Sequence, residues 1–286
     1  MLAYRRKIVR RGAIGAIIAL LVFGGRAAAD TEARCRDILQ QALADKNPET
    51  RKHAVVALSL VGGQFLSPLK AMLHDKEVEV RLATVSSLAE VKSQQAVAAL
   101  RDALNDEAPE VSFAAAKVLW GLRDAAGRQV LLAVLEGDSK TSSGFLSKQK
   151  RDAVRMIHTP RTLFLFGLQR GVGFAPVPFL GLGVASMQGL LNDAGDSGRA
   201  AAALMLANEK DQASLEALRG ALTDKDWSVR AAAVHALALR RDPRLQSELT
   251  PLLDDEEEAV RIRAAAGYLS VAVRHERTGG NASAAQ

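Results

Sequence analysis

The chain has 286 residues, a single cysteine, 48% hydrophobic and 4% aromatic residues, and a formal charge of +6. One cysteine excludes an intrachain disulfide, and few aromatic residues with much Ala and Leu favour closely packed helices over a sheet. Residues 1–29 hold six basic and no acidic side chains, and without them basic and acidic groups balance at 32 each. Because these charges balance, the overall charge of residues 30–286 does not favour binding to nucleic acid.

Residues 1–29 have the pattern of an export signal. Basic residues from Arg5 to Arg11 precede an apolar run, Ala13 to Phe23, and the small residues Ala27 to Ala29. Eleven apolar residues are too few to cross ~30 Å of hydrocarbon, so we predict cleavage before Asp30. The pair Arg5-Arg6 fits a twin-arginine leader as well as an ordinary one, which leaves the route open. The mature protein is expected to be periplasmic or secreted.

The rest of the chain repeats one phrase: an Asp, a Val-Arg or similar pair five residues later, and Ala-rich residues closing on Leu. The copies run from Asp45, Asp75, Asp193, Asp224 and Asp255, with a degraded copy from Asp106 to Ser112. The Asp residues are 30 or 31 apart except for one gap of 87. An apolar stretch before each Asp predicts one helix, the A helix, and the stretch after it predicts a second, the B helix. The fold predicted is all-α, a right-handed alpha-solenoid of about six or seven helical hairpins with one irregular insertion.

The repeated Asp and Arg side chains are expected to hold neighbouring repeats together. Each Asp offers an acceptor at the start of a B helix, and Arg is suited to paired bonds with a carboxylate at a partly buried junction. The last repeat has two candidate arginines, Arg261 and Arg263. The predicted ladder comprises Asp45, Arg51, Asp75, Arg81, Asp193, Arg199, Asp224, Arg230, Asp255 and Arg261.

The phrase Leu-Leu, Asp, Val-Arg, Ala, Ala-Leu resembles the HEAT-like repeats of the phycobilisome-lyase type. The resemblance implies a solenoid whose A helices form the outer face and whose B helices line an inner face that often binds partners. It also names a bilin lyase-like activity as an alternative. The export signal argues against that activity, because such lyases act where the pigments are made.

The gap of 87 residues contains an apolar insertion, 159–183, rich in Gly, Pro and Phe. Prolines such as Pro176 exclude an ordinary helix through it. Three interpretations stay open: a structural plug, a recognition loop for a protein or peptide, and membrane contact, since Gly171 to Leu191 carries no formal charge. The predicted organisation is signal peptide 1–29, N-terminal repeats 30–158, insertion 159–183, C-terminal repeats 184–275 and disordered tail 276–286.

The sequence offers no catalytic or metal-binding pattern and implies no cofactor. The five histidines lie in different units without ligand spacing, and no nucleophile elbow or phosphate-binding motif is present. Cys35 is interpreted as a small buried hydrophobe, with an intermolecular disulfide as the alternative.

The function predicted is a noncatalytic protein-binding scaffold or adaptor in the bacterial cell envelope, with an unidentified protein or peptide as partner. Aromatic and basic side chains often dominate such interfaces. The candidate contact residues are Phe164, Phe166, Phe174 and Phe179 of the insertion, and Lys117, Trp120, Trp227, His235 and Tyr268 of the B helices.

Overall fold

The computed structural model describes residues 28–91, 93–136 and 198–283, and all regular structure within those ranges is helical. The predicted all-α solenoid is confirmed. Several predicted features lie outside the described residues. They are the insertion 159–183 with its four Phe residues, Asp193, and all but the last two residues of the predicted signal. Residues 148–157 and 184–191, whose sequences also predict a B helix and an A helix, lie outside the described residues as well.

The N-terminal half alternates A and B helices. It begins with an A helix over residues 28–43. The elements that follow are α2 (Pro48–Val61), the 3-10 turn η1 (Gly62–Phe65), α3 (Leu66–Ala71), η2 (Met72–His74), α4 (Val78–Glu90), α5 (Gln94–Ala103), α6 (Pro109–Gly121) and α7 (Ala125–Glu136).

The C-terminal half repeats the alternation. Its elements are α11 (Gly198–Met205), η3 (Leu206–Asn208), α12 (Gln212–Ala221), α13 (Trp227–Arg240), η4 (Pro243–Leu245), α14 (Gln246–Leu249), η5 (Thr250–Asp254) and α15 (Glu258–Ser283). The backbone of α15 stays helical through Ser283, so the tail predicted from Glu276 begins inside a helix.

Local sequence signals explain where several helices begin and end. Asn47, Ser93 and Asp211 cap α2, α5 and α12 by accepting hydrogen bonds from backbone amides in the first turn. Gly62 ends α2 with a φ of 75°, a conformation that glycine adopts without a steric penalty. These caps divide the chain into helices short enough to form compact hairpins.

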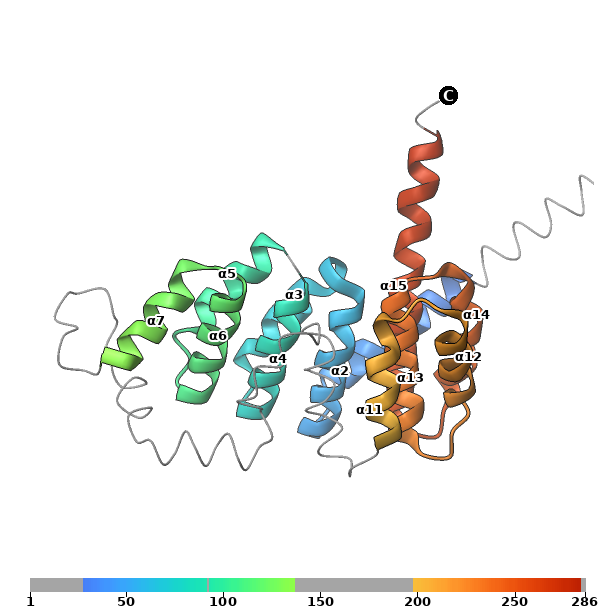
Figure 1. The fold of residues 1–286 in the computed structure, drawn as a ribbon, viewed down its shortest axis with the longest axis horizontal. Helices are drawn as coiled ribbons and strands as arrows, with labels where there is room; N and C mark the ends of the chain where they lie inside the picture. The colour runs from blue at the N-terminus through green and yellow to red at the C-terminus, as the bar shows by residue number, and fades with distance from the viewer. Residues whose placement is uncertain (1–27, 92, 137–197, 284–286) are drawn as a thin grey trace, which may run out of the picture.

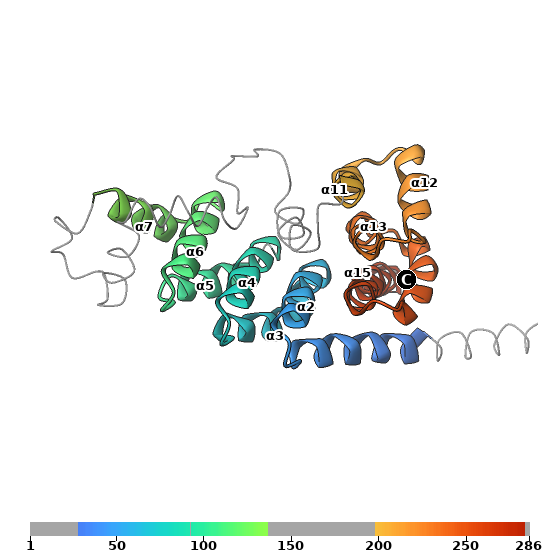
Figure 2. The ribbon, with the colours of Figure 1, turned by 90° about the horizontal axis from the view of Figure 1, so that it is seen from below.

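The helices do not stack in the order of the chain. The B helices follow one another in space as α11, α13, α15, α2, α4 and α6, with α7 packed on α6 (Figure 1). The last repeat therefore packs against the first, and both lie in the middle of the row. The row turns a corner between α15 and α2, with α12 and the helix over 28–43 on its outer side (Figure 2).

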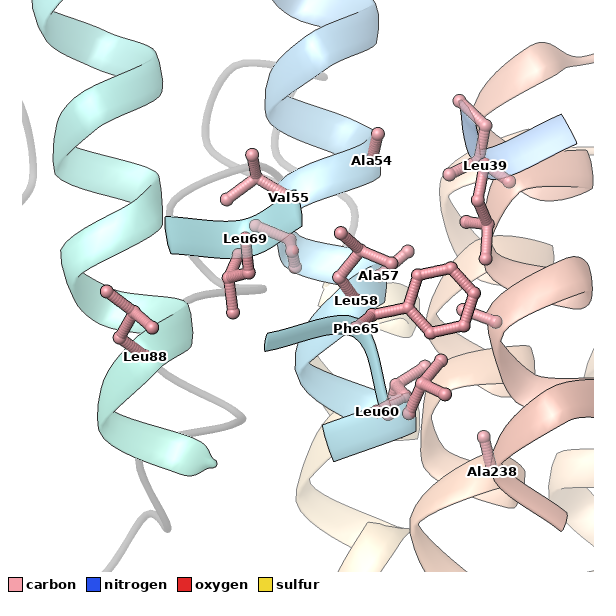
Figure 3. Packing of buried hydrophobic residues seen from close by; sticks show 14 of the residues in the cluster. Leu39, Ala54, Val55, Ala57, Leu58, Leu60, Phe65, Leu69, Leu88 and Ala238 are labelled. Carbon is pink, nitrogen blue, oxygen red and sulfur yellow. The ribbon is translucent and has the colours of Figure 1, made fainter. Parts of the chain in front are cut away.

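We call the contact of α13 and α15 with α2 and the helix over 28–43 the seam. Its core is apolar: Figure 3 shows Leu60 and Phe65 close to Ala238 of α13, and Leu39 beside the C-terminal half. All four side chains are buried. The two halves are thus joined by an apolar core of the same kind as the core within each half.

Candidate functional site

Arginine and aspartate side chains join successive repeats within each half. Arg51 donates from Nε and Nη2 to the two carboxylate oxygens of Asp75, over 2.6 and 2.8 Å. Arg230 and Asp255 form the same paired bonds at 2.8 and 2.7 Å. Arg81 and Asp106 form the same paired bonds, and Arg199 donates from Nη1 to one carboxylate oxygen of Asp224. Each Arg thus reaches forward to the Asp of the next turn.

The remaining donor of each buried arginine binds its own turn. Nη1 of Arg230 donates to the carbonyl oxygens of Asp224 and Lys225, at 2.9 and 3.3 Å. Arg51 and Arg81 bind their own turns in the same way. Each guanidinium therefore connects its own turn to the next one, because its several N–H donors point in different directions.

The aspartates of the ladder lie in the turn before each B helix and do not hold the N-cap position expected for them. Each accepts a hydrogen bond from the amide two residues on, as Asp255 does from Glu257 at 2.9 Å, which closes the turn before the B helix. The cap position itself is taken by the residue two after the Asp, such as Asp226 after Asp224. One carboxylate oxygen of the Asp therefore accepts the hydrogen bond that closes the turn. Both oxygens also accept hydrogen bonds from the Arg, as in Asp255 with Arg230.

Asp255 and Asp75 are held in their charged form. Burial raises the pKa of Asp255, but hydrogen bonds from Arg230 and the Glu257 amide and the attraction of Arg230 outweigh it, so the net pKa lies below 3.8. The same balance lowers the pKa of Asp75 beside Arg51. These ion pairs are accordingly weakened only under acid conditions.

The structure decides the register of the last repeat. Arg261 donates to the carbonyl oxygens of Asp255 and Glu256, as the ladder arginines do in their own turns. Arg263 is fully buried and lies across the seam, with Nη2 at 3.1 Å from Nδ1 of His53. Arg261 is therefore the ladder residue, and Arg263 belongs to the contact between the halves.

Polar contacts surround the apolar core of the seam. Arg34 pairs with Asp254, and the Thr50 hydroxyl donates to Glu258 over 2.8 Å. The rings of His53 and Trp227 meet edge to face with centroids 6.0 Å apart. The seam thus uses contacts of its own in place of a ladder pair.

Two seam histidines are kept neutral. Burial, followed by the charges of Arg263 and Lys52, lowers the pKa of His53 to about 3. Burial and Arg263 lower the pKa of His235 to about 3 as well. Neither ring nitrogen of His235 has a hydrogen-bond partner. His235 therefore stays neutral because it is buried near Arg263, and no hydrogen bond to its ring contributes.

Two candidate contact residues are corrected by this arrangement. His235 is completely buried, and Tyr268 is 5% exposed, with its hydroxyl hydrogen-bonded to Thr31. Neither can meet a partner, because α13 and α15 lie inside the row, covered by the N-terminal half. Trp227 is half-buried against His53.

Lys117 and Trp120 remain at the surface. Both lie on α6, and the Trp120 side chain is 55% exposed. Leu132 and Met205 are the other large apolar residues exposed in the described part of the chain, at 40% and 65%. The sequence analysis missed these two, and their regular helical spacing gave no sign of exposure.

The basic side chains Arg123 and Arg128 are also exposed near Trp120. The amide of Arg123 donates to the Trp120 carbonyl over 3.0 Å. We define the Trp120 patch as Lys117, Trp120, Arg123 and Arg128. It lies where α6 meets α7, at one end of the described row (Figure 1).

Other candidate sites receive no support from the described residues. Cys35 is fully buried, and burial raises the pKa of its thiol to about 12, so it is a poor nucleophile. No group of three or more His, Cys, Asp or Glu within residues 28–91, 93–136 and 198–283 could hold a metal ion. One described stretch, Pro48–His74, is long and apolar enough to cross a membrane, but it belongs to the solenoid core and 56% of its window is buried.

Comparison with known proteins agrees with the repeat geometry. A family profile described as HEAT repeats matches residues 66–142 and 185–270, which is more than half of the chain. The chain belongs to the HEAT-repeat family. The two matched regions of this HEAT-repeat protein lie on either side of the predicted insertion.

Individual proteins add less to that assignment. A search of curated proteins finds no match. Among solved structures, human deoxyhypusine hydroxylase in complex with glycerol is 18% identical, over 86% of this chain and 99% of that one, with a TM-score of 0.32. A TM-score this low supports no inference about activity.

Proposed function

We propose that this HEAT-repeat protein is a noncatalytic protein-binding scaffold exported to the bacterial cell envelope. The observation that carries the proposal is the exposed indole of Trp120 on the B helix α6, with exposed basic side chains on α6, after its end and on α7. Tryptophan and arginine are enriched among the residues that dominate protein interfaces. HEAT repeats commonly mediate protein interactions, which agrees with this use of the surface.

Export is supported by the leader alone, whose basic, apolar and small segments end before Asp30. N-terminal sequencing of the protein from a periplasmic fraction tests it. We expect a mature chain beginning at or near Asp30, and a full-length chain recovered from the cytoplasm would contradict export.

Partner binding is tested by crosslinking in cells and affinity capture from the envelope fraction. The intact chain is compared with Trp120→Ala and with Met205→Ala, a control that removes an even more exposed apolar side chain elsewhere. We expect a protein that the intact chain and Met205→Ala retain and Trp120→Ala loses. Absence of any specific partner from the intact chain would contradict the scaffold function.

A second candidate, membrane association, is favoured by the charge-free stretch Gly171 to Leu191. It predicts sedimentation of the intact chain with lipid vesicles and loss of that sedimentation when residues 163–183 are deleted. Equal recovery in the supernatant for both chains would exclude it.

A further inference from the structure

We infer that the Trp120 patch binds an acidic segment of a partner protein that carries an apolar anchor residue. The inference rests on the proposed function and adds the chemistry of the partner. It follows from the geometry, the charges and the backbone at the junction of α6 and α7.

The four side chains of the patch come from neighbouring positions. Lys117 and Trp120 are three residues apart on α6 and therefore lie on one face. Arg123 follows at the end of the helix. The start of α7 touches the last turn of α6, because a Cβ added at Gly127 would come within 2.4 Å of the Trp120 backbone nitrogen. This contact places Arg128, the next residue, beside the last turn of α6, where the Trp120 backbone lies.

Among the residues that the structure describes, no acidic side chain pairs with the cations of this surface. Between residues 117 and 133 the acidic group is Asp124, which already binds Arg101 and accepts from the Ala126 amide. Lys117, Arg123 and Arg128 have no ion pair within the described part of the chain. Three exposed cations beside an exposed indole match a ligand with carboxylates on either side of an apolar side chain.

The backbone of Arg123 determines how α6 ends and where this side chain lies. Arg123 has a φ of 63°, in the left-handed region that usually holds glycine at a helix end. The Asp124 amide bonds back to Leu119 over 2.8 Å, which completes the six-residue turn typical of this position. The same C-terminal turn accounts for the positive φ of Arg123 and places this exposed side chain directly after α6. Arg241 is the other non-glycine residue of this kind among those described.

Charge also argues against this chain's own segment as the occupant. The predicted helix Lys148 to Ile157 follows α7 in sequence and is the natural alternative. It contains four basic residues and one acidic residue, the same sign as the patch. An acidic partner segment complements the patch, and this segment does not.

The inference is tested with a synthetic blocked peptide that has two Glu on each side of a Leu-Phe pair, labelled with a fluorophore. Anisotropy titrations compare it with the same peptide carrying Gln in place of Glu. The intact mature chain is measured beside Trp120→Ala and the triple variant Lys117→Gln, Arg123→Gln, Arg128→Gln. Controls are Met205→Ala and the triple variant Lys46→Gln, Lys76→Gln, Lys225→Gln, which removes three exposed charges elsewhere.

We expect the Glu peptide to bind the intact chain and both controls, with binding that weakens as salt is added. Trp120→Ala should weaken binding about tenfold or more, as for a central aromatic anchor. The triple variant of the patch should weaken it and abolish most of the salt dependence.

Several results would overturn the assignment. Equal binding of the Glu and Gln peptides, no binding of the Glu peptide, or binding that appears only after residues 148–157 are deleted would each do so. So would sedimentation with phosphatidylglycerol vesicles that the triple variant of the patch loses and that the Glu peptide does not reduce. Retention of an envelope protein by a chain that fails to bind the peptide would reject this inference and leave the scaffold function standing.

Discussion

At the scale of single residues, the ladder arginines are structural. Arg230 and Asp255 are both at least nine-tenths buried and bonded through two parallel hydrogen bonds. Removing one partner of such a pair leaves a buried charge without its counter-charge. Breaking a buried ladder pair is therefore expected to lower the free energy of unfolding, mainly because the remaining partner becomes an unpaired buried charge.

We predict that Arg230→Ala lowers the free energy of unfolding by about 3 kcal/mol, as for other broken buried pairs. The matched control is Arg199→Ala, whose side chain is 55% exposed and should cost under about 1 kcal/mol. Urea denaturation followed by circular dichroism measures both. Equal losses in the two variants would contradict a stability role that depends on burial.

His235 gives a prediction for pH dependence. Its folded pKa of about 3 lies below the ordinary 6.5, so the unfolded chain binds more protons between those values. Stability is therefore full above about pH 6.5 and is lost as pH falls towards 3. His53 contributes in the same direction.

Replacing His235 by Leu should raise the free energy of unfolding by about 1 kcal/mol at pH 7, because two unpartnered nitrogens leave the core. It should also reduce the slope of stability between pH 6.5 and 4. Urea denaturation across that range measures both effects. A slope identical to that of the unmodified chain would contradict the buried, neutral state of His235.

At the scale of helices, the close approach of α7 to α6 depends on Gly127. A Cβ at this position would lie 2.4 Å from the Trp120 nitrogen and 2.6 Å from the Ala116 carbonyl oxygen, and neither backbone atom can give way cheaply. This contact also sets the position of Arg128 relative to Trp120. The packing of one pair of helices therefore determines the shape of the candidate binding surface.

We predict that Gly127→Ala detaches or shifts α7, seen as faster hydrogen exchange in residues 125–136 with little change in α13. Gly220→Ala is the matched control, because nothing lies within 4 Å of its added Cβ and it sits inside α12. That control should raise stability by about 0.5–1 kcal/mol, since alanine is the better helix former. Unchanged exchange in α7 of Gly127→Ala would show that the two helices are not in close contact.

Local patterns in the sequence predict the helices well, because caps, turns and apolar spacing act over a few residues. The spacing of Asp and Arg also indicates which side chains recur at each turn. The choice between Arg261 and Arg263 needed the structure, since both lie near the start of α15 and only their burial and hydrogen-bond partners separate them.

At the scale of the whole molecule, the order of the repeats could not be read from the sequence. Periodicity describes how each repeat contacts the next along the chain, and it contains no sign that α15 packs on α2. His235 and Tyr268 looked accessible for this reason, because a linear row would leave the last repeat near an end. The structure places it in the middle and leaves α6 and α7 exposed instead.

This arrangement makes the seam the main contact between the two halves in the described part of the chain. Its apolar core and the contacts of Arg34, Thr50 and Arg263 across it do not depend on the segment that links α7 to α11. The solenoid should therefore stay together when that link is cut.

The most direct test is to place a specific protease site between Gly137 and Ser147 of the mature chain, cleave it completely, and measure the mass of the native product by size exclusion with light scattering. We predict a single species with the mass of the intact chain, which separates into two fragments only in denaturant. Separation of the fragments under native conditions would contradict the packing of the last repeat on the first.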